Sequence, residues 1–101
     1  MPPTLSPAVN KGPNPLQPNL ELVQLTWAQV RPDLCSGYVV EVSLDGGATW
    51  PSAYTVSSGS IESLTISLAR GSTVPIGYTF RVQAGSEDGT SGFSNTESIL
   101  L

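Results

Sequence analysis

The chain has 101 residues, of which 39% are hydrophobic and only 12% are charged, and it contains ten glycines and nine prolines. A chain of this length fits one domain with a modest core. Eight acidic residues outnumber four scattered basic ones, which gives a net charge of −4; the basic residues are Lys11, Arg31, Arg70 and Arg81. Because a nucleic-acid binder needs clustered cations to displace phosphate counterions, this pattern argues against DNA or RNA as a partner.

The N-terminal sequence lacks the basic start and apolar core of a secretory signal. No apolar run approaches the length of a membrane span. Cys35 is the single cysteine, so the chain has no internal disulfide, and we interpret this residue as a small, half-buried apolar side chain. We therefore expect a chain that is made in the cytoplasm and kept there or released by lysis, or one that is cut from a larger protein.

Residues 1–19 form a proline-rich N-terminal segment with six of the nine prolines and one charge, Lys11. Since proline cannot donate to a sheet ladder, this segment is not a central strand. Two interpretations stay open, an irregular strand at a sheet edge or an extended arm that orders on a partner. We treat residues 20–101 as the folded domain that follows.

From residue 20 onward, short runs alternate between apolar and polar residues, which is the pattern of half-buried strands. The side chains predicted to face a core are Val23, Leu25, Trp27, Tyr38, Val40, Val42, Leu44, Leu64, Ile66, Leu68, Tyr78, Phe80, Val82 and Ala84. No window shows a helical period. Short strands joined by frequent turns therefore predict an all-β fold, a seven-stranded antiparallel β-sandwich.

Asp45-Gly46-Gly47 separates two of the predicted strands. Asp-Gly between alternating runs predicts a tight hairpin, because both turn residues must tolerate positive φ. The second arm of this hairpin is interrupted by Pro51, so we expect it at a sheet edge.

The same hairpin matches a second pattern. Residues 43–50, SLDGGATW, resemble the Asp box S-x-D-x-G-x-T-W of sialidase propeller blades. We interpret it as a structural turn in which Asp45 binds backbone amides, Gly47 supplies a permissive dihedral and Trp50 packs on the hairpin. One copy cannot form a propeller, which needs several four-stranded blades.

Several features together resemble a fibronectin type III domain over roughly residues 20–101. Trp27 closes the strand predicted at residues 20–27, Gly37-Tyr38 opens the one at 37–44, Tyr78 opens the one at 78–84, and a glycine-rich turn runs into SGFSN. The resemblance implies that Trp27 is the central core tryptophan. It also implies that Tyr78 forms a tyrosine corner, with its hydroxyl bonded back to the preceding loop. The long loop before Tyr78 and the proline-rich first strand depart from the family pattern.

The sequence offers little for catalysis. It has no histidine, no G-x-S-x-G and no glycine-rich phosphate loop, so we expect neither an enzyme nor a cofactor. A single cysteine excludes the usual zinc sites. If the resemblance holds, Asp33, Glu87 and Asp88 share one end of the sandwich, where a weak calcium site is the alternative to a solvated acidic rim.

Exposed aromatic side chains are the usual platform for carbohydrate. Trp50, Tyr54 and Phe93 are the candidates, although Trp50 is also assigned to the hairpin and Phe93 to a sandwich edge. The expected default for all three is therefore structural.

These features favour a non-catalytic structural or interaction domain. Fibronectin type III and immunoglobulin-like domains are common on phage particles, so the resemblance implies a decoration or accessory protein on a bacteriophage virion, on capsid or tail. Such a protein is assembled in the host cytoplasm and lies at the virion surface. A start at Met1, the lack of a secretory signal and a single domain fit this expectation. The alternatives are an accessory or carbohydrate-binding module of a secreted, extracellular glycan-active enzyme, and an adhesive or engineered protein-binding domain.

For a virion protein, the partner is a capsid or tail subunit. We expect docking through the proline-rich segment and a neighbouring sheet edge, because a stiff segment loses little conformational entropy and leaves carbonyls free. The candidate contacts are Pro2, Pro3, Pro7, Pro13 and Pro15. In the opposite orientation the loop end would dock, through Arg31, Asp33, Glu87 and Asp88.

Overall fold

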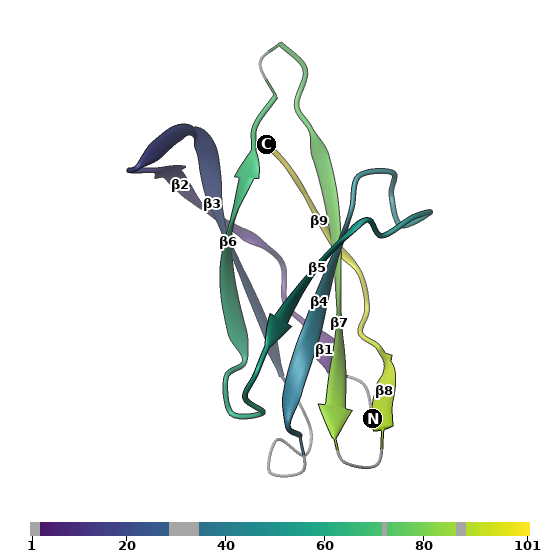
Figure 1. Cartoon of the computed structure of the whole chain (residues 1–101). Coiled ribbons are helices and arrows are strands. Elements are labelled where there is room, and N and C mark those ends of the chain that lie inside the picture. Colours follow the sequence, from purple (N-terminus) through teal and green to yellow (C-terminus); the bar gives the residue numbers. More distant parts are fainter. Residues whose placement is uncertain (1–2, 29–34, 72, 87–88) are drawn as a thin grey trace.

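The computed structural model describes residues 3–28, 35–71, 73–86 and 89–101. This part of the chain contains strands and turns but no helix, and the strands form two antiparallel sheets that face each other (Figure 1). The predicted class, an all-β antiparallel sandwich, is therefore confirmed.

The described residues contain nine strands, because two strands form in the proline-rich segment and two near the C-terminal end, where one each was expected. Their bounds are β1 (Thr4–Leu5), β2 (Val9–Asn14), β3 (Gln17–Ala28), β4 (Gly37–Ser43), β5 (Ser52–Val56), β6 (Ser63–Ala69), β7 (Gly77–Ser86), β8 (Gly89–Phe93) and β9 (Glu97–Leu100). None of the described elements is a helix long and apolar enough to cross a membrane.

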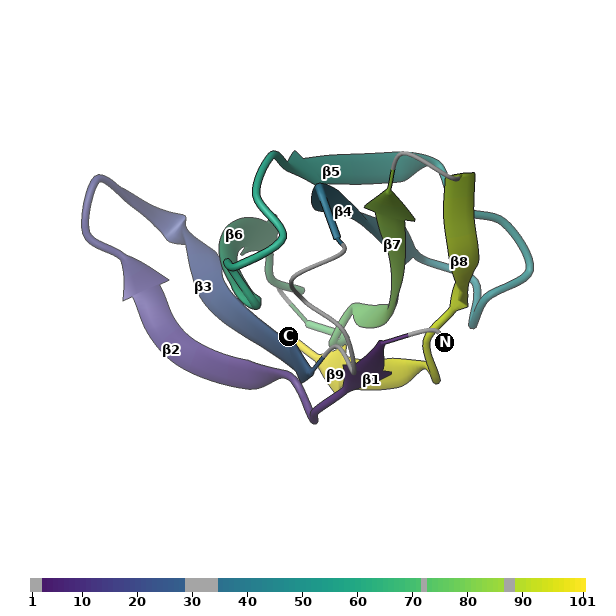
Figure 2. The same cartoon turned by 90° about the horizontal axis from the view of Figure 1, so that it is seen from below.

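Each sheet is organised around a long strand. In the four-stranded sheet, β3 pairs with β6 and, over successive parts of its length, with β2 and β1. In the five-stranded sheet the order is β5-β4-β7-β8, and β9 pairs with the first residues of β7 while β8 pairs with its last. Figure 2, which looks at the molecule from below, shows the two sheets enclosing the space that their side chains fill.

The core consists of alternate side chains from the facing strands, as the sequence pattern predicts. Its buried members are Leu5, Val23, Leu25, Trp27, Tyr38, Val40, Val42, Val56, Ile66, Leu68, Tyr78, Phe80, Val82 and Ala84, and Leu64 packs against them half-buried. The prediction for Leu44 is wrong, because its side chain is 59% exposed. β4 ends at Ser43, so the chain has already left the sheet before Leu44 and the alternation no longer applies.

Three aromatic residues bind the two sheets together. Trp27 is 2% exposed and packs edge-on against Tyr38, with ring centroids 5.1 Å apart and the rings inclined at 64°. The Tyr38 hydroxyl donates to the Gly59 carbonyl at 2.9 Å. The Tyr78 hydroxyl donates to the Ala69 carbonyl at 2.7 Å, which is a bond back across the preceding loop of the kind that the resemblance implies.

The first strand, β1, is attached to both sheets. Leu5 is buried in the core and lies opposite Trp27 of β3. The amide side chain of Asn95, from the segment between β8 and β9, binds the Leu5 backbone twice. The Leu5 N–H donates to Asn95 Oδ1 at 2.8 Å, and Asn95 Nδ2 donates to the Leu5 carbonyl at 3.0 Å. An amide side chain thus substitutes for a missing strand partner and closes the sandwich at this edge.

Candidate functional site

The β2–β3 hairpin extends beyond the sandwich on one side (Figure 1). β6 pairs with β3 from Leu20 onward, so among the described residues the end of the hairpin has no third strand beside it. We call residues 14–19 the hairpin tip. Leu16, at the turn, is 90% exposed, which makes it the most exposed large hydrophobic residue that the structure describes.

Asparagine side chains shape this hairpin. Leu16 N–H donates to Asn14 Oδ1 at 2.9 Å, and Asn14 Nδ2 donates to Ser67 Oγ of β6 at 2.9 Å. Gly12 has a φ of 95° and donates to Asn10 Oδ1 at 2.7 Å, where the pairing with β3 is irregular. Such bulges bend a strand and interrupt its ladder, so they tolerate proline at an edge.

The five prolines predicted to contact a partner are in different environments. Pro3 is buried, so its assignment as a partner contact is wrong: the chain folds inward there to bring Leu5 into the core. Pro7, Pro13 and Pro15 are exposed. Pro2 lies outside the described residues.

A second projection is the connection between β4 and β5, which we call the 44–51 loop. Ser43 is fully buried at its base, donates to Asp45 Oδ1 at 2.6 Å and accepts the Gly47 N–H at 2.9 Å. The Thr49 N–H donates to the same carboxylate at 2.9 Å, as does the Thr49 hydroxyl at 2.5 Å. Hydrogen bonds from Ser43 and Thr49 hold the pKa of Asp45 below its usual value, because they stabilise the ionised form.

The predicted hairpin is confirmed, because β4 and β5 pair antiparallel, but the turn between them is wider than the Asp-Gly signal predicts. The last paired residues are Val42 and Ser52, and positive φ occurs at Gly46 (75°) and Gly47 (101°) but not at Asp45. The carboxylate closes a wider loop by binding Thr49 four residues on. β5 pairs only with β4 among the described strands, which agrees with the edge position expected after the proline.

An arginine connects this loop to the outer face of the five-stranded sheet, the face turned away from the core. Arg81 of β7 donates from Nε to Glu41 Oε1 of β4 at 2.7 Å. Its guanidinium carbon lies 4.1 Å from the ring centroid of Trp50 and 3.6 Å from that of Phe93. Each arrangement is a cation–π contact. Arg81 therefore joins the 44–51 loop, β4 and β8 into one rigid unit.

The three candidate aromatics for carbohydrate do not share a face. Trp50 and Phe93 both stack on Arg81, whereas Tyr54 packs against the core from β5. Sequence reasoning missed Arg81, because its partners come from strands and loops far apart in the chain. The only available signal was that Glu41 and Arg81, which have opposite charges, occupy outward positions on two predicted strands.

The calcium candidates Asp33, Glu87 and Asp88 lie outside the described residues, as does Arg31. Within the described ranges no group of three or more histidine, cysteine, aspartate or glutamate residues could hold a metal ion.

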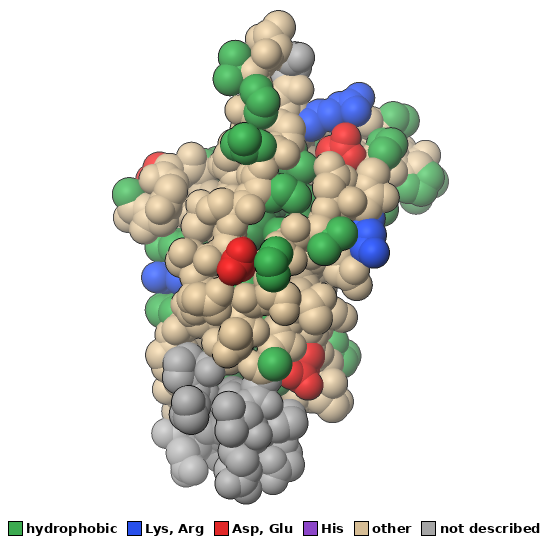
Figure 3. Space-filling view, turned by 180° about the vertical axis from the view of Figure 1, so that it is seen from behind, with side chains coloured by type: hydrophobic (Ala, Val, Ile, Leu, Met, Phe, Trp, Pro, Cys, Tyr) green, Lys and Arg blue, Asp and Glu red, His purple; other side chains and the backbone are tan. Residues whose placement is uncertain are grey.

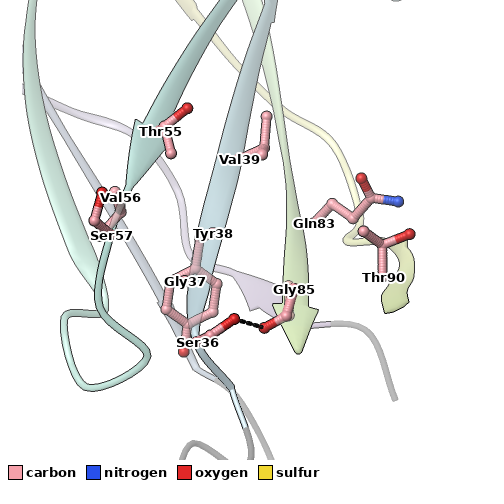
Figure 4. Close-up of a pocket in the computed structure, with 11 residues that line it drawn as sticks. Ser36, Gly37, Tyr38, Val39, Thr55, Val56, Ser57, Gln83, Gly85 and Thr90 are labelled. Atoms are coloured by element: carbon pink, nitrogen blue, oxygen red, sulfur yellow. Dashed lines mark hydrogen bonds between the residues drawn. The ribbon is translucent and has the colours of Figure 1, made fainter. Parts of the chain in front are cut away.

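Described residues line two grooves on the outer face of the five-stranded sheet. The first has a volume of about 330 Å³ and runs across the ends of β4, β5 and β7 near β8 (Figure 4). Its lining combines small polar side chains such as Thr55 and Thr90 with apolar ones such as Val39 and Val56. Ser36 Oγ donates to the Gly85 carbonyl at 3.1 Å. Tyr38 lies at this end too, where burial raises its pKa to about 12.

The second groove, which we call the β9 groove, has a volume of about 360 Å³ and lies between the 44–51 loop and β9. Leu44 and Leu100 border it and are 59% and 71% exposed. Between them β7 and β9 contribute the small residues Gly77, Thr79 and Ser98, and none of the lining residues is charged. An uncharged groove with apolar borders suits an apolar side chain.

No protein-family model matches the chain, and no curated protein matches its sequence. We therefore infer function from the geometry of the two projections and the β9 groove.

Proposed function

We propose that this protein is a non-catalytic interaction domain that docks on a protein assembly through the β2–β3 hairpin. The observation that carries the proposal is Leu16, 90% exposed at the end of a two-stranded projection that no third described strand supports. Single exposed leucines are common on protein surfaces. This one stands at an apex between two prolines, where its side chain contributes almost nothing to the folded core and is free to enter a partner.

Apolar transfer, hydration and conformational entropy all favour docking at the hairpin tip. Moving a leucine side chain from water into an apolar site contributes about 1.5–3 kcal/mol. Residues 12–20 carry no charge, so no ionised group loses its hydration. The asparagine bonds already order the turn, so binding costs little further conformational entropy.

We propose that the assembly is a bacteriophage virion, with this protein on the surface of capsid or tail. The resemblance to fibronectin type III domains, carried by Trp27, Tyr38 and Tyr78, supports this proposal. A single apical leucine gives a weak contact, and an ordered shell strengthens weak contacts by repetition. A glycan-binding role is less well supported, because the three candidate aromatics do not lie on one face.

Purified particles test the assembly. In a density gradient of particles from the natural source, quantitative mass spectrometry should find this chain at a constant ratio to one capsid or tail subunit. Finding the chain only in the soluble fractions would contradict the virion assignment.

Add-back to particles that lack the chain tests the docking surface. Leu16→Ser should weaken attachment by roughly tenfold or more, the effect expected when a buried leucine contact is lost. Val74→Ser is the matched control, since Val74 is 73% exposed on the loop between β6 and β7, and it should attach like the parent. If Leu16→Ser attaches fully while changes at Arg31, Asp33, Glu87 or Asp88 prevent attachment, the loop end is the docking face.

A further inference from the structure

The hairpin tip and the β9 groove lie on different sides of the molecule. In both Figure 1 and Figure 2 the β2–β3 hairpin projects to the left and the 44–51 loop, which borders the groove, projects to the right. Figure 3 shows the hairpin from behind, at the upper right, with hydrophobic side chains at its end. A tip on one side and a groove on the other cannot meet within one chain, but they are accessible to other copies.

We infer that the hairpin tip of one copy binds the β9 groove of a second copy, so that the protein associates head to tail. This inference rests on the proposed function, because it uses the same docking surface, and it identifies the neighbour that receives the hairpin tip within the assembly as a second copy of this chain. The contact is heterologous, since the two copies use different surfaces. Repetition of such a contact gives rings or open rows rather than closed pairs.

The two surfaces are complementary in chemistry. Each copy has a net charge of −4, so contact between uncharged surfaces avoids adding like-charge pairs to the repulsion between copies. Residues 12–20 are uncharged, and so are all the residues that line the β9 groove. Leu16 supplies an apolar knob, while Leu44 and Leu100 supply apolar walls.

The charges next to these surfaces also match. Lys11, the single charge of residues 1–19, is exposed on β2. Asp45 is exposed beside the groove, in the same loop as Leu44 and Gly46. The charges beside the hairpin tip and beside the β9 groove are therefore opposite in sign, which favours contact between these two surfaces.

The groove is preformed rather than created on binding. Leu44 lies between Ser43 and Asp45, which are fixed by the hydrogen bonds of the 44–51 loop. Trp50, at the other end of this loop, stacks on Arg81 of β7. Because the 44–51 loop is fixed at both of its ends, it loses little conformational entropy when a partner side chain binds in the groove.

Gly77 offers a way to fill the groove without disturbing the fold. It belongs to β7 and has no positive φ, so a side chain there is not strained. A Cβ added at Gly77 would meet only Leu100 Cδ2, at the ordinary contact distance of 3.5 Å. Gly77→Val should therefore block the groove of a folded protein.

Sedimentation equilibrium of the purified chain, at concentrations up to about 1 mM, measures the association. The parent and the Val74→Ser control should associate with increasing concentration and form species larger than dimers. Leu16→Ser and Gly77→Val should each stay monomeric over the same range, with cooperative melting to show that they are folded.

Mixing the two variants tests the head-to-tail geometry. Leu16→Ser keeps a groove and Gly77→Val keeps a tip, so an equimolar mixture should form dimers and nothing larger. A mixture that stays monomeric overturns the inference, as does a monomeric parent at about 1 mM or a Leu16→Ser variant that associates like the parent.

The inference and the proposed function fail in different ways. If the parent is monomeric but Leu16→Ser still loses attachment to particles, the hairpin docks on another protein and only the self-contact is wrong. If Leu16→Ser attaches to particles like the parent, the docking role of the hairpin is wrong.

Discussion

The two projections leave the sandwich on different sides and are stabilised in different ways. The β2–β3 hairpin is a two-stranded ribbon with irregular pairing, whose turn is fixed by Asn14 and whose end carries Leu16. The 44–51 loop has no strand pairing of its own. It is held by a buried hydroxyl at Ser43, by the carboxylate of Asp45 and by the stacking of Trp50 on Arg81.

The difference between the projections indicates how each is used. The Leu16 side chain at the end of the hairpin does not pack against the core, so it is available to a partner. The 44–51 loop uses nearly all of its polar groups internally, which makes it a rigid border for a groove. The hairpin tip is thus suited to insert into a partner, and the 44–51 loop is suited to border the groove that receives such a tip.

The largest effect is expected in the core that carries both projections. Trp27 lies on β3, which is one arm of the hairpin, and Tyr38 lies on β4, which precedes the 44–51 loop. Contact between their rings therefore joins the strands that carry the two projections. Trp27→Ala should lower the free energy of unfolding by about 3–5 kcal/mol, the range for removing a buried aromatic side chain. Urea denaturation measures this, with Leu16→Ala as a control that removes an exposed apolar side chain. A Trp27→Ala variant that melts within a few degrees of the parent would show that the two strands are joined elsewhere.

The next effect compares one polar side chain in each projection. Ser43→Ala should destabilise by about 1–3 kcal/mol, because it leaves Asp45 and the Gly47 N–H without the hydroxyl that binds both at a buried position. Asn14→Ala should cost less, about 0.5–1 kcal/mol, because Asn14 is only half-buried and its bond with the Leu16 N–H is exposed. Chemical denaturation of the two variants gives the order. If the order is reversed, the 44–51 loop is not the more rigid projection.

The sequence predicted the sandwich and a turn at Asp45, but not the exposed hairpin tip or the width of the 44–51 loop. Strict alternation identified the inward residues of β4, β6 and β7, because half-buried strands need only a period of two. The same rule failed at Leu44, because the 44–51 loop begins there. It also gave no strand at Val9–Asn14, because proline and irregular pairing interrupt the alternation in this edge strand. The Arg81 stack and the β9 groove depend on the register between strands that are distant in sequence, and that register follows from the whole fold.

Acid should weaken the 44–51 loop in a way that identifies Asp45. The folded pKa of Asp45 is lowered from 3.8 by hydrogen bonds from Ser43 and Thr49, so the folded state favours the ionised form. Its contribution to stability is therefore complete above the unfolded pKa and is lost as the pH falls from about 4 toward the folded pKa. Asp45→Asn should reduce stability at neutral pH and flatten the acid limb of the stability curve. An unchanged acid limb, measured by urea denaturation at each pH, would show that the carboxylate does not hold the loop.

The smallest effect on stability is expected at the hairpin tip. Leu16→Ser should change the free energy of unfolding by less than about 0.5 kcal/mol, because its side chain is already in water. Thermal and urea denaturation of Leu16→Ser and of Val74→Ser should give curves close to the parent. A large loss of stability in Leu16→Ser alone would mean that the leucine serves the fold and not a partner.

Residue-by-residue dilution tests the central structural claim, the head-to-tail contact between the hairpin tip and the β9 groove, most directly. Backbone amide NMR spectra of the parent, recorded from about 1 mM down to about 20 µM, report which surfaces leave contact as copies separate. The head-to-tail contact predicts shift changes confined to the hairpin tip and to the residues around Leu44, Gly77 and Leu100, all of them absent from spectra of Leu16→Ser. Shift changes that instead gather at residues 29–34 and 87–88, or a hairpin tip whose signals do not move at all, would contradict it.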